Sequence, residues 1–272
     1  MKPEPRCQIC VTCGVQFAPT DRVPAACPVC EDERQYVRWS GQEWTTLDEL
    51  RRDHQNEVRD DLGLSGIGTK PSFAIGQRAL LVRSPGGNVL WDCITLIDEA
   101  TVTAVQALGG LRAIAISHPH YYSSMVEWSR AFDAPVYLHA ADRRWVMRPD
   151  ERIESWDGES KALWDGMTLI RVGGHFAGGT VLHCPSGAGG RGALLCGDIV
   201  QVAQDRRWVS FMYSYPNYVP LSAAEVDRVV AVLEPYDYDR IYGAWWDRNV
   251  AVDAKQAVRR SAERYKGHLQ VG

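Results

Sequence analysis

The chain has 272 residues, of which 45% are hydrophobic and 24% are charged, the composition of a globular protein with a sizeable core. The net charge of −4 offers no basic surface for nucleic acid, and no apolar run reaches the roughly 20 residues of a membrane-spanning helix. The first residues lack the apolar core of a signal peptide, so we expect a cytoplasmic protein.

Cysteine is concentrated at the start of the chain, where five of the eight cysteines lie within the first 30 residues. Cys10 and Cys13 form one pair separated by two residues, and Cys27 and Cys30 form a second pair. Two such knuckles turn four thiolates toward one ion, which is the pattern of a structural zinc site rather than of disulfides. The sequence therefore predicts a zinc ribbon over residues 1–39.

Two alternatives remain open for this module. Two residues also separate Cys7 from Cys10, so Cys7 can replace Cys13 as its partner, although the glycine after Cys13 favours the Cys10–Cys13 knuckle. The knuckles are also similar to those of rubredoxin, in which the metal is iron. The short loop between the knuckles favours a plain zinc ribbon that caps the N-terminus.

After the ribbon, residues 40–72 are polar with a helical stretch and a glycine-rich end, which predicts a linker or docking helix. Residues 73–272 alternate apolar strands with amphipathic helices, the pattern of an α/β layered domain. We predict strands at 78–83, 89–92, 111–117, 136–139, 168–172, 180–183, 193–196 and 240–242. We predict helices at 99–108, 123–132, 222–233 and 251–266, with Ser123 or Ser124 and Ser222 as the caps of two of them.

Polar side chains follow three of the predicted strands. His118 and His120 come directly after a buried strand, and side chains two residues apart on an extended chain point to the same side. His175 follows two glycines after a later strand, and Asp198 follows Gly197 at the end of another. Three histidines and an aspartate at strand ends predict one metal site. The other histidines, at 54, 139, 183 and 268, are expected to be structural or solvated.

This order of motifs resembles the metallo-β-lactamase superfamily. The family's first motif is His-x-His-x-Asp-His after a buried strand, followed about fifty residues later by a histidine in a glycine-rich turn and then by a strand that ends in Gly-Asp. The matching residues here are His118, His120, His175 and Asp198, and Asp92 matches a supporting aspartate at the end of an early hairpin. The resemblance implies a four-layer αββα sandwich.

The departures from the family motif concern the second metal. Tyr122 and Ser123 stand where the family has its aspartate and final histidine, and residues 242–247 contain no late histidine. A phenol, a hydroxyl and an indole do not replace a carboxylate and two imidazoles around a divalent ion. The resemblance thus implies one intact site, with His118, His120 and His175 as ligands and Asp198 as a further ligand.

These residues suit metal-assisted hydrolysis. Three neutral imidazoles leave an open position on zinc, and a zinc-bound hydroxide at neutral pH can attack an ester, lactone, thioester or amide. We expect Asp198 to accept a proton, Tyr122 to donate a hydrogen bond to a developing oxyanion, and Asp92 to hold one histidine in its tautomer. The expected cofactors are two zinc ions, one structural and one at the histidines.

Two other function classes remain in view. Loss of the second metal site also suits a non-catalytic binding protein with the same fold. A redox protein, by analogy with diiron relatives that carry rubredoxin modules, fits less well because the second-site ligands are missing. We expect a small-molecule substrate and neither a nucleic acid nor a membrane as partner, and the sequence allows an oligomer.

Overall fold

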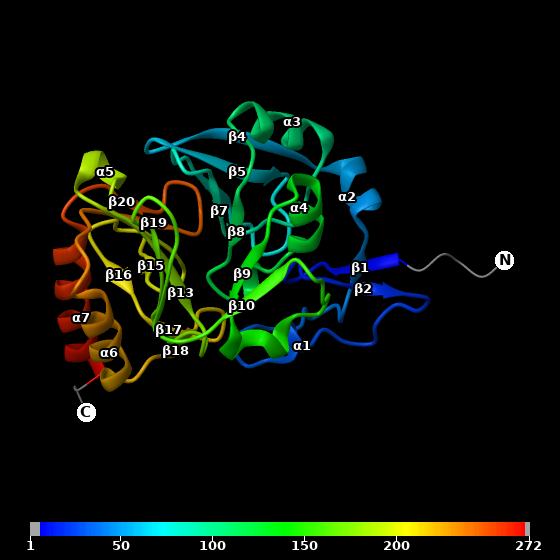
Figure 1. Cartoon of the computed structure of the whole chain (residues 1–272). Coiled ribbons are helices and arrows are strands. Elements are labelled where there is room, and N and C mark those ends of the chain that lie inside the picture. The colour runs from blue at the N-terminus through cyan, green and yellow to red at the C-terminus, as the bar shows by residue number, and fades with distance from the viewer. Residues whose placement is uncertain (1–5, 270–272) are drawn as a thin grey trace. The chain divides into compact units, whose positions relative to one another are not determined.

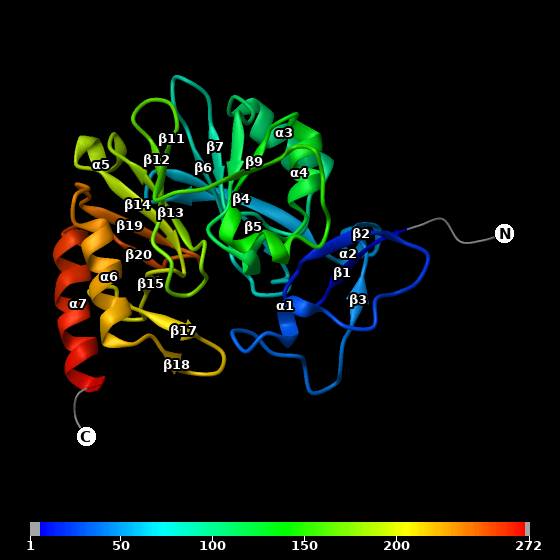
Figure 2. The same cartoon turned by 60° about the horizontal axis from the view of Figure 1, so that its bottom comes forward.

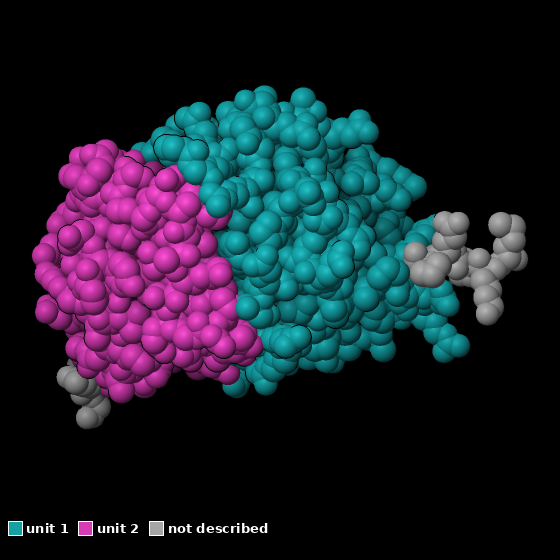
Figure 3. All heavy atoms as spheres, in the orientation of Figure 1, with its two compact units in different colours: residues 1–138, 142–155 teal, residues 139–141, 156–272 magenta. Residues whose placement is uncertain are grey.

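The computed structural model describes residues 6–269 and contains two compact units. Unit 1 is formed by residues 1–138 and 142–155, and unit 2 by residues 139–141 and 156–272 (Figure 3). Within the described range, none of the helices combines the length and the apolar character that a bilayer crossing requires.

Unit 1 begins with a small cysteine-containing module (Figure 2). Its three-stranded sheet has the order β2-β1-β3, and β1 pairs antiparallel with both neighbours. The elements are β1 (Arg6–Cys10), β2 (Gln16–Thr20), the short helix α1 (Pro28–Glu31) and β3 (Trp44–Thr45). Because β3 pairs with β1, this module extends past the predicted end at residue 39.

A seven-stranded sheet, in the order β10-β9-β8-β7-β6-β5-β4, follows the module. The strands from β4 to β7 are antiparallel, whereas β7, β8 and β9 are parallel. The bounds are β4 (Gln55–Asp61), β5 (Leu64–Lys70), β6 (Ala79–Val82), β7 (Val89–Trp91), β8 (Ala113–Ala115), β9 (Val136–His139) and β10 (Ile153–Trp156).

The prediction of a linker over residues 40–72 is wrong for most of that segment. Only α2 (Leu47–Asp53) is helical, and a Thr46–Glu49 capping box starts it. Residues 55–70 form the β4–β5 hairpin, which pairs with β6 and extends the sheet. The polar sequence concealed this hairpin because β4 is largely exposed and β5 contains two glycines.

Crossover helices connect the parallel strands of unit 1 (Figure 1). As predicted, α3 (Glu99–Ala107) lies between β7 and β8 and is followed by Gly109 and Gly110, both at positive φ. The 3-10 turn η1 (Pro119–Tyr121) and the helix α4 (Met125–Phe132) lie between β8 and β9, and the 3-10 helix η2 (Ala140–Trp145) follows β9. Ser124 precedes α4, but its hydroxyl donates to Thr95 O instead of capping the helix.

Unit 2 contains a six-stranded sheet in the order β11-β12-β13-β14-β19-β20. Only the β14–β19 pair is parallel within this sheet as described. The bounds are β11 (Ser160–Ala162), β12 (Thr168–Arg171), β13 (Thr180–Cys184), β14 (Ala193–Gly197), β19 (Arg240–Gly243) and β20 (Asn249–Val250). A short helix α5 (Gly187–Gly190) and two hairpins, β15 (Gln201–Val202) with β16 (Val209–Ser210) and β17 (Met212–Ser214) with β18 (Val219–Pro220), complete the strands.

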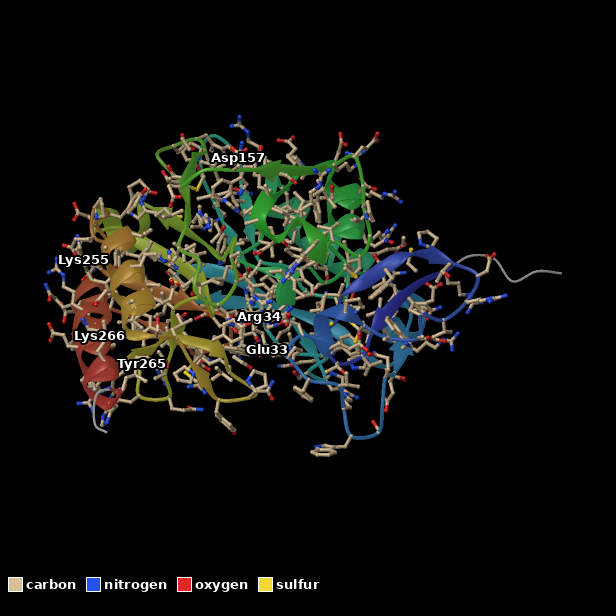
Figure 4. All side chains as sticks on the ribbon, turned by 90° about the horizontal axis from the view of Figure 1, so that it is seen from below. Glu33, Arg34, Asp157, Lys255, Tyr265 and Lys266 are labelled. Carbon is tan, nitrogen blue, oxygen red and sulfur yellow. The ribbon has the colours of Figure 1, made fainter. Side chains whose placement is uncertain are left out.

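Two helices, α6 (Ala223–Leu233) and α7 (Ala254–Leu269), share the hydrophobic core of unit 2 with its sheet. Ser222 caps α6 as predicted, because its hydroxyl accepts a hydrogen bond from Glu225 N at 3.2 Å. Figure 4 labels Lys255, Tyr265 and Lys266 on α7. Lys266 pairs with Asp227 of α6, so an exposed ion pair joins the two helices outside their apolar contact.

Candidate functional site

Cys10, Cys13, Cys27 and Cys30 form a buried group in unit 1, with all four sulfur atoms within 4.8 Å of one another. The Sγ atoms of Cys10 and Cys30 are 3.5 Å apart, and those of Cys13 and Cys27 are 3.7 Å apart. Four sulfurs around one zinc ion at about 2.3 Å are separated by about 3.8 Å, so the group fits tetrahedral zinc.

The local backbone explains this grouping. Gly14 N donates to Cys10 O at 2.8 Å in the first knuckle, and Cys30 N donates to Cys27 O at 2.9 Å in the second. Burial raises the pKa of the Cys13 thiol, so a nearby cation is needed to hold it as a thiolate. Cys7 is not a member of the group, which resolves the alternative pairing in favour of Cys10 with Cys13.

Gln42 is a contact of this group that the sequence analysis missed. Its Nε2 donates to Cys10 Sγ at 3.1 Å. Residue 42 lies in the segment predicted as a linker, and no local pattern points to it. It reaches the sulfur because β3, two residues later, pairs with β1.

His118 and His120 lie side by side in unit 1, with ring centroids 5.1 Å apart. The predicted reason for their proximity, alternation along an extended strand, is wrong. The strand β8 ends at Ala115, and His120 lies inside the turn η1, which Pro119 begins. Proline sets the backbone angle φ of a first helical position, so the turn brings the second ring beside the first.

Ser117 orients the first histidine. Its Oγ lies 2.9 Å from His118 Nδ1, which leaves Nε2 as the ring nitrogen that can serve as a metal ligand. Asp92 accepts a hydrogen bond from Ser117 N at 2.8 Å, and therefore supports His118 through Ser117. Burial raises the Asp92 pKa to about 7, against the opposing effects of Ser117 and the Arg78 charge.

His175 lies in unit 2, in the glycine-rich turn after β12. Gly173 and Gly174 have φ of 70° and 78°, values that other residues rarely adopt. Nδ1 of His175 is 2.7 Å from Tyr213 O and 3.2 Å from Met212 O, so it donates to the β17 backbone. This hydrogen bond selects Nε2 as the possible metal ligand. The sequence analysis did not identify these two carbonyls.

Asp198 directly follows β14 in unit 2 and is 5% exposed. Gly197 before it has a φ of 56°, so the chain turns sharply at the strand end. The main-chain oxygen of Asp198 accepts a hydrogen bond from the Tyr215 hydroxyl at 3.0 Å. Burial, with a smaller effect of the Asp198 charge, raises the Tyr215 pKa well above its usual value.

Tyr122 and Ser123, which the sequence analysis predicted to stand in place of second-metal ligands, lie in the interior of unit 1. Burial raises the pKa of the Tyr122 phenol, so it remains protonated at neutral pH. The Ser123 hydroxyl accepts from Gln77 Nε2 at 3.2 Å and lies 3.4 Å from Cys93 O. The Ser123 side chain is thus used in packing the loop.

The three histidines at 118, 120 and 175 form a second group of possible metal ligands, and all three are buried. Asp198 is not a member of that group, so its role as a ligand stays a prediction. His139 and His183 are not members of that group, and their rings bond to Gly158 O and Asp237 O in unit 2.

No family model matches the chain. The protein YmaE of Bacillus subtilis, described as uncharacterised, is 50% identical over 260 residues, which are 94% of each chain.

Solved structures of metallo-β-lactamases share the fold at low sequence identity. The DIM-1 enzyme is 14% identical with a TM-score of 0.59, over 79% of this chain and 98% of that one. FIM-1 of Pseudomonas aeruginosa, in its mono-zinc form, is 14% identical with a TM-score of 0.57, over 78% and 96%. The chain thus has the metallo-β-lactamase fold with a four-cysteine module at its N-terminus, and it belongs to the same protein family as YmaE.

Proposed function

We propose that this protein is a metal-dependent hydrolase that holds one zinc ion with His118, His120 and His175. Its substrate would be a small molecule with an ester, lactone, thioester or amide bond. The observation that carries this proposal is the group of three buried histidines. Three neutral imidazoles suit a zinc ion and leave one coordination position open for water or substrate.

The number of ions in the proposal follows from the neighbouring residues. Ser123 occupies the place of a second-metal histidine, and its hydroxyl is engaged with Gln77 Nε2. Tyr122 beside it is a buried phenol. Neither side chain is a good ligand for a divalent zinc ion, so the histidines would hold a single ion.

Bound zinc would act as a Lewis acid that polarises a carbonyl group and makes water a nucleophile at neutral pH. Ser117 Oγ and the Tyr213 carbonyl hold the rings of His118 and His175 by their Nδ1 atoms. We propose that Asp198 accepts the proton of the attacking water. A protonated Tyr122 would donate a hydrogen bond to the developing oxyanion.

The proposal is tested by metal analysis together with hydrolysis of a chromogenic acetate ester, a lactone and a thioester. His118→Ala should contain one metal ion fewer per chain than the wild type and should lose turnover. A matched control is His183→Ala, which removes a buried histidine of unit 2 whose Nε2 bonds to Asp237 O. Unchanged metal content in His118→Ala would contradict the proposal.

The alternative of a binding protein is favoured by the structural use of Ser123, because its hydroxyl bonds to Gln77 Nε2 and Cys93 O and not to a second metal. Metal bound at the histidines without turnover of any of these substrates would support it.

A further inference from the structure

The first cysteine knuckle packs directly against two loops of unit 1 that lead to the histidines. Gly14, next to Cys13, is in the left-handed region at φ 80°. Its carbonyl oxygen accepts a hydrogen bond from Thr95 Oγ1 at 3.0 Å. A Cβ atom at residue 14 would lie 2.4 Å from Thr95 Oγ1, so the contact requires glycine at this position.

The second contact is made two residues later, where Gln16 N donates to Ser123 O at 3.0 Å. Ser123 has a φ of 46°, a strained conformation for a serine, and such residues persist when their surroundings hold them. The Ser123 carbonyl is held by the module, and its hydroxyl is held by Gln77.

A third contact fixes the direction of the strand that leaves the knuckle. The Gln16 side chain bonds to Arg148 and lies 3.4 Å from Glu127 of α4, and Arg148 also pairs with Glu127. Ala18 N donates to Met147 O at 3.1 Å. The module is therefore joined to the loop of Ser123 from several directions.

Both loops reach the histidine pair within a few residues. Ser123 is three residues after His120, and Thr95 is three residues after Asp92, which bonds to Ser117 beside His118. Ser124 Oγ donates to Thr95 O at 2.5 Å and ties the two loops together.

We infer that the metal-bound four-cysteine module clamps these two loops and thereby sets the positions of His118 and His120, with Gly14 and Thr95 as positioning residues. The inference rests on the proposed metal site at the histidines. The clamp depends on the cysteine-bound metal because four thiolates within 4.8 Å repel one another without a cation. Loss of that metal would release the knuckle and weaken metal binding at the histidines.

The experiment loads the full chain with Co²⁺ and then competes the ion away with a graded chelator. Sulfur-bound cobalt has thiolate charge-transfer absorption that nitrogen-bound cobalt lacks, so the two sites are read separately. The variant Thr95→Val removes the hydroxyl that bonds Gly14, and Thr95→Ser retains it. The matched control is Thr101→Val, a buried threonine of α3 whose hydroxyl bonds Asn56 instead.

Thr95→Val should keep the sulfur-bound cobalt while its histidine site binds cobalt about tenfold more weakly, as is typical when a group that orients metal ligands is removed. Thr95→Ser should restore the wild-type affinity, and Thr101→Val should match the wild type. Gly14→Ala should reproduce the defect, because its Cβ displaces Thr95.

The remaining outcomes separate this inference from the proposed function. Equal histidine-site affinity in Thr95→Val and the wild type would overturn the clamp and leave the hydrolase proposal intact. A wild type that binds cobalt at the histidines but hydrolyses no substrate would overturn the hydrolase proposal. A weaker cobalt affinity of the histidine site in Thr95→Val than in Thr95→Ser and Thr101→Val would still support the clamp. A wild type that binds cobalt only at the cysteines would overturn both.

Discussion

The buried ion pair between Arg78 and Asp61 gives a sharp test of how unit 1 is stabilised. The guanidinium is fully buried and the carboxylate side chain is only 6% exposed. Arg78 directly precedes β6 and Asp61 ends β4, so the pair joins strands on either side of β5. Substituting Arg78→Met leaves the Asp61 carboxylate buried beside an apolar side chain.

Removal of one partner of a buried ion pair costs about 3–5 kcal/mol, because the other charge stays desolvated. We therefore expect Arg78→Met to lower the free energy of unfolding by about 4 kcal/mol, a large part of the roughly 5–15 kcal/mol of a typical domain. The double variant Arg78→Met/Asp61→Leu should recover most of this loss, since both charges are gone.

Urea unfolding followed by circular dichroism, at neutral pH and with saturating zinc, measures these differences. The matched control is Arg152→Met, whose partner Asp133 is 84% exposed, and which should cost about 0–1 kcal/mol. A loss of less than about 1 kcal/mol in the free energy of unfolding of Arg78→Met would refute the reasoning about buried charge, provided that the slope of this free energy against urea concentration is unchanged.

Three further changes have defined outcomes. Burial raises the Asp92 pKa from 3.8 to about 7, so the folded protein keeps a proton that the unfolded chain loses, and the free energy of unfolding falls as the pH rises through this window. In metal-free protein this fall is about 2 kcal/mol between pH 5 and pH 7, and urea unfolding of Asp92→Asn should show a correspondingly smaller fall. Ser222→Ala removes the cap of α6 and should cost about 1 kcal/mol by the same measurement, whereas a loss near zero would mean that the Glu225 amide finds another acceptor. Tyr122→Phe should keep the metal content of the wild type and reduce turnover if the phenol donates to the oxyanion, and unchanged turnover would assign Tyr122 to packing alone.

The sequence was sufficient for the features that depend on local pattern. Four cysteines in two knuckles indicated one metal group, and the structure confirms that group. The order of the histidine and Gly-Asp motifs resembled that of the metallo-β-lactamase superfamily, and the solved structures confirm the fold that this resemblance implied. Such signals are visible in a sequence because ligand spacing and hydrophobic periodicity act over a few residues.

The hairpin of residues 55–70 could not be identified in this way. Its first strand is mostly exposed, and its pairing with β6 depends on the register of a neighbouring strand rather than on its own composition. The long-range contacts of the site were hidden for the same reason. Gln42 reaches Cys10, and Tyr213 O reaches His175, through residues that are 32 and 38 positions apart in the chain.

The sequence thus predicted which residues can bind metal, and its resemblance to the metallo-β-lactamase superfamily implied which second-site ligands are missing. The folded chain settled how those residues are held: His120 is brought beside His118 by a proline-started turn, and Asp92 acts through Ser117. Folding also joins the cysteine module to a loop that leads to the histidine pair, through the hydrogen bond between Gly14 and Thr95, which are 81 residues apart. The physical reason is that ligand type is a property of single side chains, whereas ligand position depends on hydrogen bonds between segments that only folding brings together.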